Sequence, residues 1–456
     1  MPDPLKRVLV QQLKIPNPKY LDAAKNGYST YGIPEFITNF SVLPDGSFQV
    51  PRGYLQKLLG TATGMGVKYD IVDKRSRFDM LDLDSSHIQL RPYQARALKD
   101  LVMNGQEGLL VSPAGSGKTV MGLSLIPMFG QPTLWLTHTT PLFEQALARA
   151  ETFLPYLKGD DIGTIGAGND WKVGNVLTVG MVQTLVRRPE ETYTLMNKFG
   201  MVILDEAHHA PATTFTQVLG TLNPFFLYGL TATHIRRDGL HNLMFQVLGE
   251  VLSTVTIDEV RKHEGIHVPK VICRYIDEVP IQAVSFGQIL SELVDHPGRN
   301  ILITNDIVSE AERGNICVVI TDRRRHAEIL YEFIKARWNN TTIATGNYNK
   351  KQQKEAISKL EAGEATVLVT TASLLGEGFD HAPINRGFLC LPFRNAAKTE
   401  QILGRIQRTA EGKEDAIVYD YVDNHSLLQH QFRNRGSLGC RYDVYQKLGC
   451  VVEEVR

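Results

Sequence analysis

The sequence predicts an α/β protein with two parallel-sheet domains in tandem, preceded by a small N-terminal α+β domain. Two observations support this prediction. Short, β-rich apolar runs alternate with helical stretches over residues 87–255, and the same alternation returns over residues 256–425. Runs that are apolar at nearly every position are typical of parallel strands covered by helices on both faces. A chain of 456 residues is long enough for about three domains with their own cores.

The apolar runs define the expected elements. In residues 87–255 the expected strands are GLLVS (108–112), TLWLT (133–137), NVLTVG (175–180), MVILD (201–205) and FFLYGLT (225–231), with helices such as 118–128, 141–154 and 212–220 between them. In residues 256–425 they are NICVVIT (315–321), TTIAT (341–345), ATVLVT (365–370), GFLCLP (387–392) and AIVYDYV (416–422). Residues 1–86 combine short apolar runs with turn signals and are expected to form the α+β domain. Residues 426–456 are expected to form one or two terminal helices.

Composition excludes several classes of protein. Lys plus Arg and Asp plus Glu both number 49, so the zero net charge excludes a histone-like polyelectrolyte, although not a local basic groove. No run of about 20 apolar residues occurs, so no membrane span is expected, and the first residues contain no plausible signal cleavage site. The five cysteines are odd in number, widely spread and without a CxxC pair. We therefore expect free, buried thiols in a protein of a reducing compartment, the cytoplasm.

A glycine-rich run, SPAGSGKT at 112–119, lies between an expected strand and an expected helix. Gly115 and Gly117 let the backbone curl so that several N–H groups point at one anion, and the helix N-terminus adds its positive end. Lys118 can reach the β- and γ-phosphates of a nucleotide, and Thr119 can give its hydroxyl to Mg²⁺. The predicted nucleotide-binding residues of this run are Gly115, Ser116, Gly117, Lys118 and Thr119.

Two carboxylates follow the apolar strand MVILD, in the run DEAHH at 205–209. In enzymes with a phosphate-binding loop, an acidic residue at such a strand end holds the Mg²⁺ and its waters, which is the role we expect for Asp205. Glu206 is positioned to orient and deprotonate an attacking water. Two adjacent histidines without further ligands make a poor zinc site, so we expect His208 to link the nucleotide site to neighbouring motifs.

A third motif, QILGRIQR at 401–408, places polar residues where a core-facing helix would be apolar. Gln401, Gly404, Arg405 and Arg408 share one helix face by the i, i+3, i+4, i+7 rule. Two guanidiniums on one stripe can stabilise the charge of a phosphoryl group during its transfer. The motif therefore predicts a second catalytic element, supplied by the second α/β domain.

In this order and spacing, the motifs resemble the core of superfamily 2 helicases, over about residues 90 to 410. Within that superfamily they are most similar to the phage UvsW-type and XPB/RecG-like branch-migration helicases. The resemblance implies two RecA-like domains at 87–255 and 256–425, ATP and Mg²⁺ as cofactors, and ATP hydrolysis coupled to nucleic-acid unwinding. It also implies site residues: Arg91, Gln94, Gly376 and Asp380 for the nucleotide; Thr139, Gln183, Thr321, Arg323, Thr370 and Thr371 for the nucleic acid; His208, Thr231 and Thr233 for coupling; and Lys118, Asp205, Glu206, Gln401, Arg405 and Arg408 for catalysis.

Two further strings resemble those of the DNA-acting members. TATHIRRDG at 231–239 resembles a motif of DNA translocases, and PRGY at 51–54 resembles a string in a DNA-engaging accessory domain, although a turn before a helix explains it equally well. The implied substrate is DNA, as a single tracking strand and as branched or forked duplex, for unwinding, branch migration or fork regression in replication, recombination or repair. Three alternatives stay open: a duplex-DNA translocase or restriction motor that separates no strands, an RNA-remodelling helicase, and a binding module that uses ATP as a switch.

Overall fold

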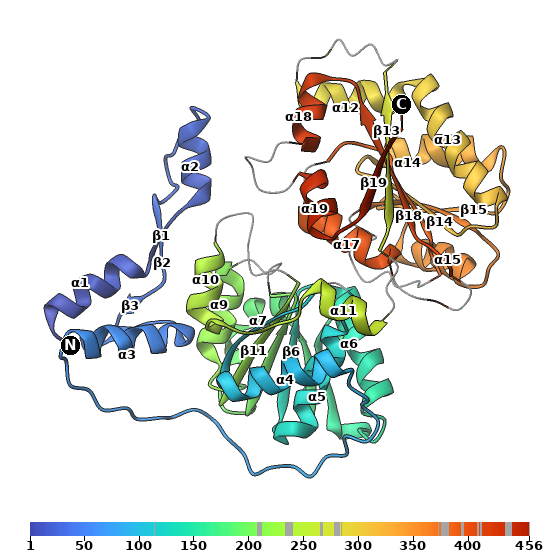
Figure 1. The fold of residues 1–456 in the computed structure, drawn as a ribbon. Helices are drawn as coiled ribbons and strands as arrows, with labels where there is room; N and C mark the ends of the chain where they lie inside the picture. Colours follow the sequence, from blue (N-terminus) through green and yellow to red (C-terminus); the bar gives the residue numbers. More distant parts are fainter. Residues whose placement is uncertain are drawn as a thin grey trace. The chain divides into compact units, whose positions relative to one another are not determined.

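The chain folds into two compact units in the computed structural model, Met1–Glu259 and Val260–Arg456, and each is an α/β domain (Figure 1). The two RecA-like parallel-sheet domains and the small N-terminal domain predicted from the sequence are confirmed. The structure describes residues 1–113, 115–207, 212–232, 240–264, 268–277, 283, 285–372, 374, 383–393, 396–407, 410, 413–433 and 440–455.

The first unit contains an eight-stranded sheet with the order β12-β5-β11-β10-β6-β9-β7-β8. Every neighbouring pair is parallel except β7 and β8, which pair antiparallel. The strands are β5 (Glu107–Val111), β6 (Thr133–Thr137), β7 (Ile162–Gly166), β8 (Asn169–Lys172), β9 (Leu177–Met181), β10 (Met201–Asp205), β11 (Phe226–Thr231) and β12 (Val251–Thr254). The helices are α4 (Pro92–Asn104), α5 (Lys118–Phe129), α6 (Thr140–Phe153), α7 (Val182–Arg187), α8 (Pro189–Tyr193), α9 (Ala212–Thr221) and α10 (His241–Leu248).

The five strands predicted for this unit are its five most buried ones, whereas its edge strands were not predicted. β6, β9, β10 and β11 are buried at every position, as their apolar runs require. By contrast, β7 and β8 (IGTIG and NDWK) contain glycine or polar residues, and β12 is only four residues long. β8 and β12 are the edge strands, and β7 is the next strand in from β8. A strand at or near the edge of a sheet is less covered, so its sequence carries a weaker apolar signal.

The second unit contains a seven-stranded parallel sheet with the order β15-β16-β14-β17-β18-β13-β19. Its strands are β13 (Lys270–Ile276), β14 (Cys317–Thr321), β15 (Thr341–Ala344), β16 (Val367–Thr371), β17 (Arg386–Leu389), β18 (Ile417–Asp423) and β19 (Val451–Val455). The helix α11 (Ile257–Glu264) includes the last residues of the first unit and the first of the second. The helices that follow are α12 (Phe286–Asp295), α13 (Pro297–Glu312), α14 (Arg324–Lys335), α15 (Lys350–Glu361), α17 (Ala396–Ile406), α18 (Ser426–Arg433) and α19 (Arg441–Lys447).

The terminal segment corrects one expectation. It contains the helices α18 and α19, but residues 451–455 then form β19, which pairs in parallel with β13 at the edge of the sheet. The run VVEEV is exposed or half-buried throughout, so no buried apolar run marked it as a strand. β13 was missed as well, because its sequence KVICRYI mixes charged and apolar residues.

The N-terminal part has the predicted α+β character. It comprises α1 (Asp3–Gln12), β1 (Lys14–Pro16), α2 (Pro18–Lys25), β2 (Phe36–Thr38), β3 (Ser41–Val42), β4 (Phe48–Gln49), the 3₁₀ helix η1 (Arg52–Tyr54) and α3 (Leu55–Gly64). Its small core consists of Leu5, Leu9, Leu13, Tyr54 and Ala62. Since this core is small, contacts with the adjoining sheet contribute to holding the domain in place.

The expectation of free thiols has a structural counterpart. The five cysteines are free thiols, and all are buried except the half-buried Cys450: Cys273, Cys317, Cys390, Cys440 and Cys450. Within the described ranges, no helix combines the length and apolar character needed to cross a bilayer. Nor do three or more His, Cys, Asp or Glu side chains gather there as a metal cluster would require.

Candidate active site

The glycine-rich run forms a loop between β5 and α5. Gly115 and Gly117 have φ values of 83° and 79°, in the left-handed region that favours glycine. A Cβ atom at Gly117 would lie 2.4 Å from Nε2 of Gln94, so no other residue fits there without displacing that amide. The local sequence therefore produces the curled loop that it predicted.

Hydrogen bonds hold this loop from within. The Ser112 hydroxyl donates to the Ser116 hydroxyl at 2.5 Å, and the Ser116 hydroxyl donates in turn to the Pro113 carbonyl at 2.7 Å. The backbone N–H of Ser112 donates to the Thr231 carbonyl at 2.9 Å, which ties the loop to the end of β11. A loop held this way needs little reorganisation to present its N–H groups to an anion.

The start of α4 contacts the same loop. The side chains of Tyr93 and Gln94 both donate to the Ser116 carbonyl, at 3.0 and 2.9 Å. The Gln94 amide oxygen accepts the Arg91 N–H at 2.9 Å, while the Arg91 side chain is exposed. Tyr93 was not among the predicted site residues, because nothing in the string RPYQ marks the phenol as a loop contact.

Lys118, the first residue of α5, lies beside Asp205 and Glu206 at the carboxyl end of β10. The ammonium of Lys118 lies 3.4 Å from Oε1 of Glu206 and 3.3 Å from the Ser112 carbonyl. The backbone N–H of Glu206 donates to Oδ1 of Asp205 at 3.0 Å. Glu206 also has a φ of 49°, which is uncommon for a residue other than glycine. Strain of this kind is concentrated at functional sites, where the surrounding structure maintains it.

The electrostatics of the site are those of two carboxylates facing one ammonium. The pKa of Asp205 is raised to about 7, because burial and the adjacent Glu206 both raise it while Lys118 opposes them. Desolvation and like charge both penalise a second ionised carboxylate in a buried site. Such a site favours an added cation, and carboxylate and hydroxyl oxygens are donors that Mg²⁺ prefers.

The residues predicted for the nucleic-acid strand have internal partners. In the first unit, the Thr139 hydroxyl accepts the Leu142 N–H at 3.5 Å and caps α6, and Gln183 donates to the His138 carbonyl at 2.7 Å. In the second unit, the buried Thr321 hydroxyl lies 2.9 Å from Nδ1 of His326, and the buried Thr370 hydroxyl lies 3.5 Å from the Thr371 carbonyl. Their strand-contacting role stays a prediction.

Of the other predicted residues, some lie in the part of the chain that the structure describes and some lie outside it. Arg323 is exposed at the start of α14, Gln401 and Arg405 are half-buried on α17, and Thr231 is buried at the end of β11. Five others lie outside the described residues: His208, Thr233, Gly376, Asp380 and Arg408.

The PRGY string has a structural role. Arg52 forms an ion pair with Glu107 of β5, and its guanidinium donates to the Pro224 and Phe225 carbonyls. A Cβ atom at Gly53 would lie 2.2 Å from the Gly249 nitrogen, so η1 packs directly against the end of α10. The string is therefore a tight turn that docks the N-terminal domain onto the first sheet, and Arg52 is occupied by that docking.

Comparison with known proteins identifies helicase families and helicase relatives. Residues 87–236 match the family described as Type III restriction enzyme, res subunit, and residues 299–410 match the Helicase conserved C-terminal domain. The "Probable helicase D10" of Escherichia phage T5 is 26% identical over 365 residues, covering 78% of this chain and 76% of that protein. The "DNA 3'-5' translocase XPB2" of Sulfurisphaera tokodaii is 33% identical over 173 residues, covering 38% and 37%.

Solved structures share the fold. Saccharomyces cerevisiae Dbp5 bound to RNA and ADP BeF3 has a TM-score of 0.56 and 16% identity, covering 80% of this chain and 89% of that one. The Type ISP restriction-modification enzyme LlaBIII bound to DNA has a TM-score of 0.57 and 15% identity, covering 85% and 32%. At such identities the likeness concerns the tandem-domain fold alone.

Proposed function

Because this chain is a superfamily 2 helicase, and so an ATP-dependent motor enzyme, we propose that it acts on branched or forked DNA. Its activities would be strand unwinding, branch migration and fork regression during replication, recombination or repair. The proposal that the substrate is DNA rests on the 33% identity over 173 residues to a protein named as a DNA 3'-5' translocase. The TATHIRRDG string at 231–239 supports it from the sequence.

The loop at 112–119 would hold the phosphates of ATP. Gly115 and Gly117 have left-handed φ values, and at Gly117 a Cβ atom would collide with Gln94. A loop curled in this way suits a cradle for a polyphosphate. Among the residues that the structure describes, the closest partners of the Lys118 ammonium are the Ser112 and Pro113 carbonyls at 3.3 and 3.5 Å and Glu206 at 3.4 Å. A phosphate would offer this ammonium shorter, charge-assisted bonds.

Glu206 would act as the general base. Once Lys118 engages phosphate, the Glu206 carboxylate can accept a proton from the attacking water. Thr119 and Asp205 would hold Mg²⁺, which when bound neutralises charge on the phosphates. The buried position of Asp205 and its raised pKa support a cation as its natural partner.

Arg405 and Arg408 would stabilise the phosphoryl group in transfer, and Gln401 would orient it. Their common helix face in the sequence supports these roles. Gly376 and Asp380 would complete the nucleotide contacts, and Arg91 and Gln94 would contact the adenine. Residues at the strand ends would hold the phosphate backbone of one DNA strand without reading its bases.

A substrate panel tests the proposal. ATP hydrolysis and strand displacement are measured with single-stranded DNA, forked DNA, a Holliday junction, blunt duplex DNA and an RNA duplex, with Lys118→Ala as the inactive control. We expect the highest rates and strand separation on forked or four-way DNA. Preferential stimulation by RNA would instead establish the RNA-helicase alternative. Hydrolysis that increases with duplex DNA without any strand separation would establish the translocase alternative.

A further inference from the structure

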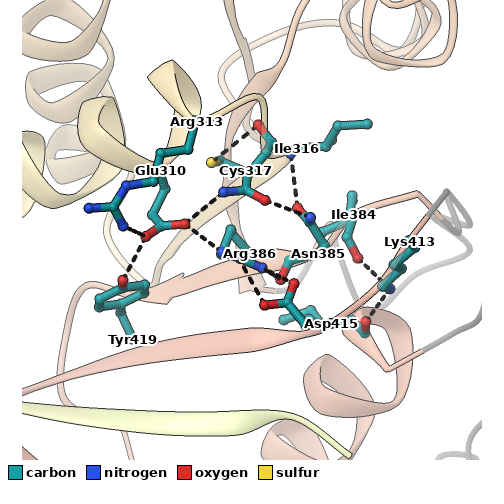
Figure 2. A network of polar contacts seen from close by, with 12 residues as sticks. Glu310, Arg313, Ile316, Cys317, Ile384, Asn385, Arg386, Lys413, Asp415 and Tyr419 are labelled. Carbon is teal, nitrogen blue, oxygen red and sulfur yellow. Dashed lines mark hydrogen bonds and ion pairs between the residues drawn. The ribbon is translucent and has the colours of Figure 1, made fainter. Parts of the chain in front are cut away.

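Lys413 is a buried lysine of the second unit that the proposed chemistry does not use. Its side chain is 8% exposed, an unusual burial for an ammonium group. The Nζ atom donates to the Ile384 carbonyl at 2.6 Å and also to the Ile406 carbonyl, and Figure 2 shows Lys413 pointing at Ile384. The ammonium therefore bridges two backbone segments 22 residues apart, from position 384 to position 406.

Both segments belong to the proposed nucleotide machinery. Ile406 is the last residue of α17, the helix that carries Gln401 and Arg405. Ile384 follows the run that contains Gly376 and Asp380 and lies just before β17. The last carbonyls of a helix have no partner within it, and a cation at that end is stabilising. Lys413 thus fastens the last turn of α17 to the entry of β17.

A polar network holds the chain beside Lys413 in place (Figure 2). Asp415 accepts two hydrogen bonds from Arg386, at 2.6 and 3.2 Å, and Arg386 donates a third to Glu310 at 2.5 Å. Tyr419 donates to the other oxygen of Glu310 at 2.9 Å. Arg386 is buried at the first position of β17, so this network anchors residue 415 to the same strand entry. The backbone at Lys413 is therefore not free to follow a displaced helix end.

We propose that Lys413 is a positioning residue for ATP hydrolysis: by holding the Ile406 carbonyl, it fixes the orientation of Arg405, the preceding residue on the same last turn of α17. The inference rests on the proposed function, in which Arg405 contacts the transferring phosphoryl group. Small misplacements of a catalytic group lower the rate strongly while leaving substrate affinity nearly intact. Lys413 accordingly acts on kcat through Arg405, without touching ATP.

A double-mutant cycle tests this role. Lys413→Met removes the donors but keeps the apolar stem, Lys413→Arg keeps donors, and Arg405→Ala removes the positioned group. We expect Lys413→Met to lower kcat for DNA-stimulated ATP hydrolysis about 10- to 100-fold, with KM for ATP changed less than about twofold. We expect Lys413→Arg to restore most of the rate. Arg405→Ala combined with Lys413→Met is expected to be no slower than Arg405→Ala alone.

Lys447→Met is the matched control. Lys447 also contacts α17, through Glu400 at 2.7 Å, but 68% of its side chain is exposed, so its removal should leave kcat unchanged. Multiplicative losses in the double variant, or a wild-type rate in Lys413→Met, would overturn the inference. If Lys413→Met does not fold, Lys413→Gln, which keeps a polar end but removes the charge, takes its place in the same cycle with Arg405→Ala. A wild-type rate in Arg405→Ala would instead refute the proposed role of Arg405, and the positioning role with it.

Discussion

Replacing Arg52 by alanine tests whether one guanidinium docks the N-terminal domain. Arg52 and Glu107 are 21% and 13% exposed, so their ion pair is largely buried, and the guanidinium also donates to the Pro224 and Phe225 carbonyls. Burial lowers the pKa of Arg52, while Glu107 opposes that effect. The variant leaves a buried carboxylate and two carbonyls without this donor.

The expected loss in the free energy of unfolding follows from the burial of this ion pair. Removing one partner of a buried pair costs about 3 to 5 kcal/mol, and the remaining exposure of Arg52 places this site near the lower end, at about 3 kcal/mol. For a unit of this size, such a loss lowers the melting temperature by about 6 to 12 °C. Scanning calorimetry of the full chain measures the shift, because the two units need not unfold together.

Arg75 provides the matched control for this experiment. Its pair with Asp73 is more exposed, at 25% and 43%, so Arg75→Ala should cost less than about 1 kcal/mol. If Arg52 docks the N-terminal domain, Arg52→Ala should show a clear loss of stability and Arg75→Ala should not. The reasoning is refuted if Arg52→Ala melts like the wild type and instead loses affinity for DNA, as a DNA-engaging arginine would.

Three further predictions concern the nucleotide site. Lys118→Ala and Glu206→Gln should each lower nucleic-acid-stimulated ATP hydrolysis by roughly 100-fold or more. The control Lys99→Ala, at an exposed lysine of α4, should leave the rate unchanged. Near-normal turnover in either site variant would contradict the catalytic roles of Lys118 and Glu206. Asp205→Asn should stabilise the nucleotide-free protein in a pH-dependent way. The pKa of Asp205 is raised to about 7 on folding, so its ionisation opposes folding fully above about pH 7 and hardly at all below about pH 4. The gain in melting temperature should therefore be largest at alkaline pH, and an equal gain at acid and alkaline pH would exclude this cause. Gln94→Ala should raise KM for ATP about fivefold, because it removes the 2.9 Å hydrogen bond to the Ser116 carbonyl, which is worth roughly 1 kcal/mol. An unchanged KM would show that this hydrogen bond does not support nucleotide binding.

Local sequence was sufficient for the central strands and for the phosphate-binding loop. β6 and β10 begin and end at the predicted residues, because a strand buried on both faces is apolar at nearly every position. The loop was predictable because glycine has no Cβ atom and so adopts the left-handed φ values found at Gly115 and Gly117 with little strain. The edge strands β8 and β19 could not be predicted in this way, since each has a sheet neighbour on one side only.

What the sequence by itself determined is thus the tandem α/β architecture, the curled loop, and the carboxylates at the end of β10. Only the tertiary structure decided that Arg52 docks one domain on another, across 55 residues to Glu107 and 172 residues to Pro224. Likewise, Lys413 stands in a run of charged residues that is typical of a solvated loop, yet packing buries it between two carbonyls. The physical reason is that apolar periodicity and backbone preference act over a few residues, whereas the partner of a buried charge is set by which distant segments the folded sheets bring together.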